Sequence, residues 1–209
     1  MSAEYQDYGW NDRSLQSTGY LYPVLREMLR YDKGKRILDM GCGNGEIANL
    51  LLAEGFDVMG IDASFTGVEV ANKKNPGRFF VHDVSQDKLP AEVADIPFDI
   101  VISTEVIEHL YAPRAYMRLI QKTLQAKQGQ VILSTPYHGY LKNVALALVG
   151  KMDQHYTALW DGGHIKFWSR QTLTTLLEEF GFRVTDFRGA GRLPYLWKSM
   201  IIRASLRTP

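Results

Sequence analysis

The sequence predicts an α/β fold with a doubly wound, mostly parallel sheet of seven strands and an antiparallel hairpin at one edge. Two observations predict it. Short apolar runs alternate with segments of helical periodicity along most of the chain, and the last two apolar runs are joined by a short connection. Alternation puts helices on both faces of a parallel sheet, whereas two strands with a short connection pair antiparallel.

Seven strands are predicted from apolar runs bounded by turn residues: 36–40, 57–61, 79–82, 99–103, 130–134, 182–188 and 196–204. Helical periodicity predicts helices over 20–31, 46–53, 64–74, 112–125 and 169–180. Ser169 is placed to cap the last of these helices. The right-handed crossover rule puts the carboxyl ends of the parallel strands along one edge of the sheet, where ligands bind.

Length and composition predict one domain over residues 1–209. Residues 1–31 form an N-terminal segment ahead of the first strand, and residues 135–168 have no place in the alternation, so they are predicted to be an insertion over the strand ends. The single cysteine, Cys42, excludes an internal disulfide and favours a reducing, cytoplasmic location. No segment approaches the roughly 20 apolar residues of a membrane span. The net charge of +1 gives no sign of the basic surface that nucleic-acid binding requires.

A glycine-rich turn follows the first strand. Gly41, Gly43 and Gly45 form a G-x-G-x-G pattern, which differs from the G-x-G-x-x-G of dinucleotide sites. Asp39 stands two residues before the first glycine, where an acid would repel a pyrophosphate and would suit the ammonium group of an amino-acid tail. S-adenosylmethionine has such a tail and no phosphates. A strand–helix turn with incidental glycines is the alternative.

The spacing I-L-D-M-G-C-G-N-G resembles motif I of the class I S-adenosylmethionine-dependent methyltransferases, which have a Rossmann-like fold. The resemblance implies that the turn holds the methionine part of the cofactor, Asp62 the ribose hydroxyls, and Asp83 with Val84 the adenine. For Asp62 the alternative is a helix N-terminal acid, and for Asp83 it is a plain turn residue. The cofactor-binding set predicted in this way is Asp39, Gly41, Gly43, Gly45, Asp62, Ala63, Asp83, Val84 and Thr104.

The acceptor site is predicted after the fourth strand. Glu105, Glu108 and His109 have the spacing that one helical turn brings together, and His164 follows after the fifth strand. E-x-x-E-H with a later histidine resembles the O-methyltransferases of ubiquinone biosynthesis, over residues 36–185. The arrangement is also similar to the small-RNA 3′-terminal 2′-O-methyltransferases, in which two acids and two histidines bind a divalent metal.

Three roles stay open for these residues. Glu105, Glu108, His109 and His164 are candidate ligands for Mg, Mn, Fe or Zn, and a bound metal would lower the pKa of an acceptor hydroxyl. Alternatively His109, His164 and Glu105 are catalytic without a metal, with a histidine as general base. The third possibility is a structural role. The remaining histidines, His82, His138 and His155, are interpreted as surface or loop residues.

The resemblance implies methylation of a small hydroxylated or phenolic molecule at oxygen. The alternatives are RNA 3′ ends, which the near-neutral charge disfavours, N-methylation of a small molecule, and a non-catalytic binding module. The apolar segment 140–150 suits a hydrophobic acceptor. A buried helix is favoured there over contact with a membrane surface. The aromatic lead-in either folds over the cofactor or packs as ordinary structure; it consists of Tyr5, Tyr8, Trp10, Tyr20 and Tyr22.

Overall fold

A computed structural model describes residues 9–11, 15–124, 129–156 and 158–207 of the chain. Its centre is a seven-stranded sheet in the order β3-β2-β1-β4-β5-β7-β6. The strands are β1 (Arg36–Met40), β2 (Asp57–Asp62), β3 (Phe79–Val81), β4 (Ile100–Thr104), β5 (Gln130–Pro136), β6 (Phe182–Ala190) and β7 (Ser199–Leu206). Strands β1 to β5 pair parallel, and β7 pairs antiparallel with both β5 and β6. The predicted sheet with its antiparallel edge hairpin is confirmed.

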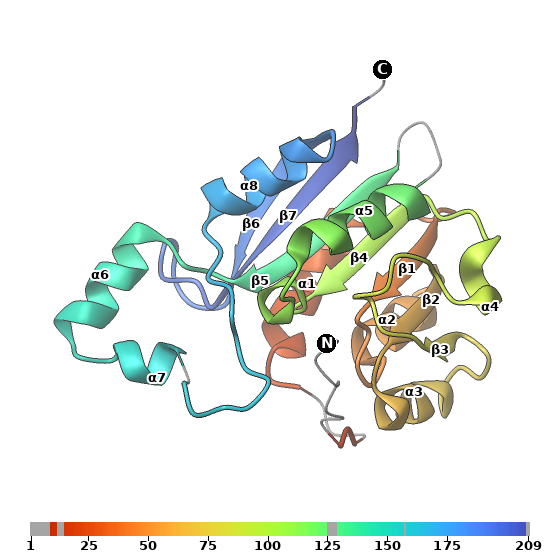
Figure 1. Ribbon diagram of the computed structural model, residues 1–209, viewed down its shortest axis with the longest axis horizontal. Helices are drawn as coiled ribbons and strands as arrows, with labels where there is room; N and C mark the ends of the chain where they lie inside the picture. Colours follow the sequence, from red (N-terminus) through yellow and green to blue (C-terminus); the bar gives the residue numbers. More distant parts are fainter. Residues whose placement is uncertain (1–8, 12–14, 125–128, 157, 208–209) are drawn as a thin grey trace.

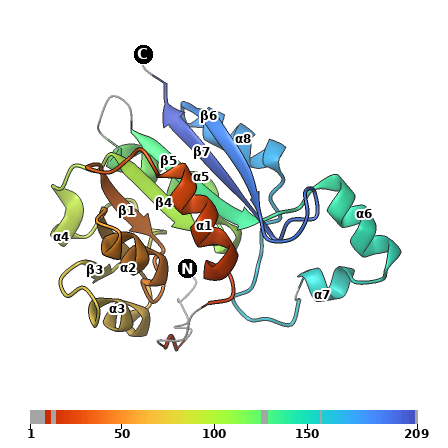
Figure 2. The ribbon, with the colours of Figure 1, turned by 180° about the vertical axis from the view of Figure 1, so that it is seen from behind.

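Helices cover both faces of this sheet (Figures 1 and 2). One face carries α1 (Thr18–Met28), α2 (Glu46–Ala53) and α3 (Phe65–Asn72), and the other carries α4 (Ala91–Ala94), α5 (Pro113–Thr123) and α8 (Arg170–Glu179). The 3₁₀ turn η1 (Ile107–His109) follows β4, and α6 (Tyr140–Leu148) and α7 (Met152–Tyr156) follow β5. Three residues named in the sequence predictions, Gln125, Tyr5 and Tyr8, lie outside the described residues.

Strand β1 shows how the sequence builds two cores. Successive side chains of a strand point to opposite faces. Ile37 accordingly packs in the cluster under α1, α2 and α3, whereas Leu38 and Met40 pack in the cluster under α5 and α8. Each such fully buried side chain stabilises the fold by about 2 kcal/mol. Because β1 is buried on both faces, its end is held rigidly, and that end carries Asp39.

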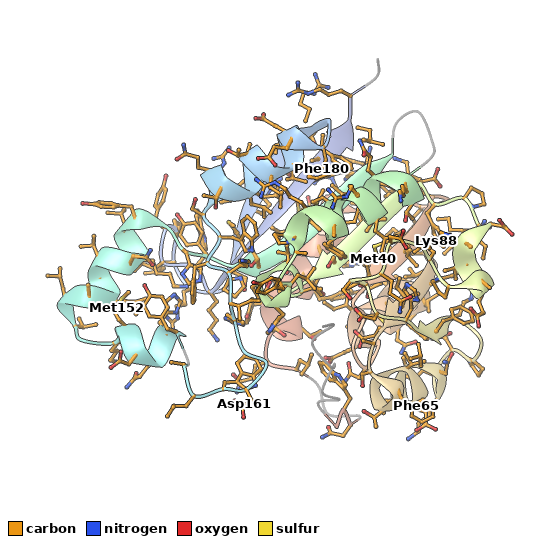
Figure 3. All side chains as sticks on the ribbon, viewed as in Figure 1. Met40, Phe65, Lys88, Met152, Asp161 and Phe180 are labelled. Atoms are coloured by element: carbon orange, nitrogen blue, oxygen red, sulfur yellow. The ribbon has the colours of Figure 1, made fainter. Side chains whose placement is uncertain are left out.

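The insertion differs from the prediction. The expectation that residues 140–150 form a buried helix is wrong: Tyr140 and Leu148 are 80% and 82% exposed, and Lys142 is the buried residue of α6. The reason is that α6 leaves the end of β5 and extends away from the sheet, with α7 beside it (Figure 1). Met152 and Asp161 mark this outlying part in Figure 3. In the described part of the chain, no helix is both long enough and apolar enough to cross a membrane.

A buried ion pair joins the loop between α1 and β1 to the hairpin, and we expect its loss to lower stability. Arg203 of β7 lies 2.7 Å from Asp32, whose side chain is 4% exposed, and Lys35 lies 2.8 Å from the same carboxylate. Replacing Arg203 by Met leaves Asp32 buried with half of its cationic partners. We expect the free energy of unfolding to fall by about 2 kcal/mol, measured by urea denaturation. The matched control is Arg207→Met, which removes an exposed pair and is expected to change it by less than about 0.5 kcal/mol.

Candidate active site

The predicted site residues come together at the carboxyl edge of the parallel strands. Asp39 lies near the end of β1, Asp62 ends β2, and Thr104 ends β4. Because parallel strands end at the same edge, residues far apart in the sequence become neighbours there. Strand pairing sets Asp39 opposite Gly60 on one side and Ile102 on the other.

The glycine turn has a backbone that only glycine adopts readily. Gly41, Gly43 and Gly45 have φ values of 83°, 55° and 68°. A Cβ on Gly41 would overlap the Cγ2 atom of Val106, and one on Gly45 would lie 2.5 Å from the Cβ of Ala71 in α3. The first glycine therefore lets the loop after β4 approach the turn, and the third lets α2 and α3 pack closely. Val106 was not predicted as a site residue, although it lies within the E-x-x-E-H motif.

Asp39 is a buried acid whose two carboxylate oxygens have no hydrogen-bond partner among the described residues. Burial raises the pKa of this carboxyl to about 8, with a further contribution from the negative charge of Asp62. A buried carboxylate without a partner is unfavourable. A cationic ligand would remove that cost, so this orphaned acid fits the ammonium group of an amino-acid tail.

Asp62 holds the turn in place. One of its oxygens accepts a hydrogen bond from the backbone N–H of Gly43 at 2.7 Å, and the other accepts from that of Ser64 at 2.8 Å. Ser64 in turn caps α3 by accepting from the N–H of Gly67 at 2.9 Å. The carboxylate thus links the glycine turn to the start of α3, a structural task that the sequence did not reveal.

The remaining predicted cofactor residues lie at neighbouring strand ends. Ala63 joins β2 to α3 and is half-buried, as is Thr104. Asp83, after β3, accepts a hydrogen bond from the N–H of Ser85 at 2.8 Å, which is the contact of a turn residue. Val84 is buried against the cluster under α5. None of these contacts conflicts with a nucleoside over the strand ends.

The N-terminal segment packs on the glycine turn. A Cβ on Gly43 would lie 3.0 Å from the ring of Trp10, and the backbone N–H of Trp10 donates to the hydroxyl of Thr66 at 3.1 Å. The side-chain amide of Asn44 donates to the carbonyl of Asn11 at 3.0 Å. The aromatic-rich lead-in was the only sequence signal for these contacts. They place Trp10 beside the predicted cofactor site.

Glu105 has an unusual backbone conformation, and each of its carboxylate oxygens accepts a hydrogen bond. Its φ is 55°, so it lies outside the helical turn, and the predicted helical spacing from Glu105 to His109 is wrong. Its carboxylate accepts from Ser134 of β5 at 2.7 Å and from Ser199 of β7 at 3.0 Å. Burial raises the pKa of Glu105 to about 7, although these hydroxyls favour the charged form.

Glu108, His109 and His164 form a compact acid–imidazole group. Each offers one ligand atom, and these atoms lie within 4.8 Å of one another. Glu105 is not part of this group. Glu108 is fully buried, and neither of its carboxylate oxygens has a hydrogen-bond partner among the described residues. Burial, followed by the charge of Glu105, raises the pKa of Glu108, against a smaller opposing effect of the nearby Thr135 hydroxyl, which forms no hydrogen bond of normal geometry with it. Like Asp39, Glu108 is therefore an orphaned acid that a cation would satisfy.

Backbone hydrogen bonds bring His164 to this group from the insertion. The carbonyl of Glu108 accepts from the N–H groups of Ile165 and Lys166 at 2.9 and 3.0 Å. The imidazoles of His109 and His164 consequently lie edge to face with centroids 4.9 Å apart. His109 and His164 are far apart in the sequence, and no local pattern predicts that they meet. Only the resemblance to other sequences suggested that they form one site.

The segment that carries His164 also determines which ring nitrogen of His109 bears the hydrogen. Its Nδ1 lies 2.9 Å from the carbonyl oxygen of Gly162, which can only accept, so Nδ1 carries the hydrogen and Nε2 keeps a lone pair. Burial lowers the pKa of His109, and burial together with the charge of His109 lowers that of His164 to about 4. Both imidazoles are therefore neutral at pH 7, as a general base or a metal ligand must be.

Comparison with known proteins identifies the family of the chain. The sequence matches the family described as "Methyltransferase domain" over residues 16–186, and the chain belongs to this family. The predicted class, an S-adenosylmethionine-dependent methyltransferase, is confirmed. Among the relatives, the ubiquinone biosynthesis O-methyltransferase of Dinoroseobacter shibae is 34% identical over 162 residues, which are 75% of this chain and 63% of that protein. The chain thus spans less than two thirds of the length of this relative.

Two solved structures show the same fold. Magnesium protoporphyrin IX methyltransferase from Synechocystis PCC 6803, with bound S-adenosylhomocysteine, superposes with a TM-score of 0.67 and 21% identity, covering 89% of this chain and 82% of that chain. The methyltransferase domain of bacterial CtHen1-CN superposes with a TM-score of 0.63 and 22% identity, covering 88% of this chain and 97% of that chain. At these identities the likeness extends to the fold alone.

Proposed function

We propose that the protein transfers the methyl group of S-adenosylmethionine to a hydroxyl oxygen of a small hydroxylated or phenolic molecule. The observation that carries this proposal is the contact between Gly41 and Val106. It sets the loop that bears Glu108 and His109 directly against the turn that would hold the methyl donor. Groups suited to activating a hydroxyl would therefore lie beside the methyl group of the donor.

Seven of the nine predicted cofactor residues have a defined task in this proposal. Asp39 would pair with the ammonium group of the donor, and the backbone of Gly41 to Gly45 would follow its methionine part. Asp62 would accept from the ribose hydroxyls while still holding the turn, and Asp83 with Val84 would border the adenine. Trp10 would cover the donor, and the segment 162–166 would close the acceptor side through His164.

The chemistry is a single in-line displacement. A lone pair of the acceptor oxygen forms a bond to the methyl carbon as the carbon–sulfur bond breaks, and the electron pair of that bond stays on sulfur. The proton of the hydroxyl passes to Nε2 of His109, whose Nδ1–H is held by Gly162. The site otherwise contributes by positioning the two reactants and excluding water.

A divalent cation is the second candidate for activating the hydroxyl. The unpaired, buried carboxylate of Glu108 and the two neutral imidazoles fit such an ion, which would lower the pKa of a bound hydroxyl. Glu108, His109 and His164 would hold it. The earlier assignment of Glu105 as a fourth ligand requires its release from Ser134 and Ser199.

Two measurements test the proposed function. We expect calorimetry to show that S-adenosylhomocysteine binds with a dissociation constant below about 100 μM. We also expect transfer of labelled methyl to catechols, tested with and without Mg²⁺ or Mn²⁺. No binding at millimolar ligand contradicts the proposal. Transfer only to amines, or only to RNA 3′ ends, replaces it by one of the alternatives; the net charge of +1 disfavours RNA.

A further inference from the structure

Helix α6 turns its basic residue inward and its apolar residues outward. Lys142 is 6% exposed, whereas Tyr140, Leu141 and Leu148 are 55% to 82% exposed. An ammonium group has three donors, and for Lys142 the structure gives one hydrogen bond, to the carbonyl of Lys198 at 3.3 Å. Among the described residues Lys142 forms no ion pair within 4 Å. This is the reverse of an ordinary amphipathic helix and requires a reason.

Two histidines, His138 and His155, lie within electrostatic range of Lys142. His138 is buried, and its Nδ1 lies 3.3 Å from Nε2 of the half-buried His155; their ring centroids are 4.7 Å apart. Burial and the charge of His155 lower the pKa of His138 to about 3, with Lys142 contributing further. Burial and the charge of Arg192 lower the pKa of Lys142 to about 8. We call Lys142, His138 and His155 the basic cluster.

Such a cluster is unfavourable on its own. Burying an amine without an anion costs free energy, and nearby positive charges increase the cost. The carboxylate of Glu105 is the acid whose charge acts on Lys142, but it is already hydrogen-bonded to two serines. The first turn of α6 adds the partial positive charge of its free N–H groups. An anionic ligand would offset the cost of the buried amine, the repulsion between nearby positive charges and the partial charge of the helix end.

The basic cluster borders the acid–imidazole group. Phe167 packs edge to face on His138 with centroids 5.1 Å apart, and Phe167 lies three residues after His164 in the same segment. Tyr156, the neighbour of His155, packs on the same Phe167 ring with centroids 4.9 Å apart. The segment that carries His164 therefore continues directly onto the basic cluster.

We propose that the basic cluster binds an anionic substituent of the methyl acceptor, a carboxylate or a phosphate. This inference rests on the proposed function, because it assigns the acceptor's second anchoring point. Lys142 would make the charged contact, and His138 and His155 would donate hydrogen bonds. The acceptor would then be an acidic hydroxylated molecule, held between the basic cluster and the acid–imidazole group.

Direct binding tests the inference without methyl transfer. We expect benzoate and phenyl phosphate to bind the protein and to shift the imidazole ¹H–¹⁵N resonances of His138 and His155. Lys142→Met should weaken both at least tenfold, and His155→Gln should weaken them as well. The matched control is Lys151→Met, which removes an exposed lysine of the same insertion and should leave both affinities unchanged. The tighter of the two ligands identifies the carboxylate or the phosphate class.

Three results overturn the inference: no anion binding to the wild-type protein, equal binding to Lys142→Met, or binding of the neutral benzyl alcohol as tightly as benzoate. Thermal unfolding and S-adenosylhomocysteine calorimetry on each variant show that it is folded. These readouts also separate the two proposals. Cofactor binding without anion binding contradicts only the basic-cluster assignment, whereas absence of cofactor binding contradicts the proposed function.

Discussion

Replacing Asp39 by Asn should reduce the affinity for S-adenosylhomocysteine at least 100-fold and at the same time stabilise the ligand-free protein. The carboxylate of Asp39 is buried without a partner, so in the free protein it only costs free energy. In the complex it would pair with the ligand's ammonium group, which an amide cannot replace. Calorimetry measures the first effect and thermal unfolding the second.

The stabilising effect of Asp39→Asn should depend on pH. The pKa of Asp39 is raised from 3.8 to about 8 in the folded protein, so between these values the folded state keeps a proton that the unfolded chain has lost. Wild-type stability therefore falls, relative to the variant, as pH rises from about 4 to about 8. At pH 8.5 we expect the variant to melt about 5 °C or more above the wild type. At pH 4 the difference should largely disappear.

The control for Asp39→Asn is Asp95→Asn, which changes an exposed acid at the end of α4. It should alter neither cofactor affinity nor the pH dependence of unfolding. If Asp39→Asn bound S-adenosylhomocysteine as tightly as the wild type, the assigned contact between Asp39 and the ammonium group would be wrong. A variant that lost affinity and stability together would show that Asp39 supports the fold and is not held ready for a ligand.

The sheet and the cofactor turn could be predicted because their signals are local. The apolar run 36–40, the acid at Asp39 and the alternating glycines all lie within ten residues, and each has one simple physical meaning. Strand ends elsewhere moved by one to three residues, as for β7, which was predicted from residue 196 and begins at Ser199. Such shifts reflect competition between neighbouring turns and leave the topology unchanged.

The acceptor side was less predictable because long-range contacts decide it. Helical spacing predicted Glu105 beside His109, but hydrogen bonds from Ser134 and Ser199 hold Glu105 in a left-handed conformation. His138 was interpreted as a surface or loop residue, and it does lie in a loop but is buried, whereas His155 lies in α7. Apolar composition predicted a buried helix over residues 140–150. Composition does not reveal whether any other element covers a helix, and here α6 extends away from the sheet (Figure 2).

Replacing Glu108 by Gln should lower kcat for methyl transfer at least 100-fold while leaving S-adenosylhomocysteine affinity within about twofold, a loss of about 2.7 kcal/mol in transition-state stabilisation. The amide keeps the volume of the side chain but removes the charge that would hold a cation or orient the two imidazoles. Because burial raises the pKa of Glu108 and its carboxyl group has no hydrogen-bond partner among the described residues, the replacement should not destabilise the fold. Steady-state kinetics, calorimetry and thermal unfolding measure the three quantities.

The same variant distinguishes the two ways of activating the acceptor hydroxyl. If Glu108, His109 and His164 hold a divalent cation, the wild-type protein should bind Mn²⁺ in a spectroscopic titration, lose activity on chelation and regain it on addition of metal, whereas Glu108→Gln should bind no Mn²⁺. If His109 acts as the base, chelation should leave kcat unchanged and His109→Gln should be the more damaging variant. The control is Glu178→Gln on the exposed face of α8, which should keep full activity. Full activity in Glu108→Gln would contradict both roles proposed for Glu108, which are holding a cation and orienting the two imidazoles.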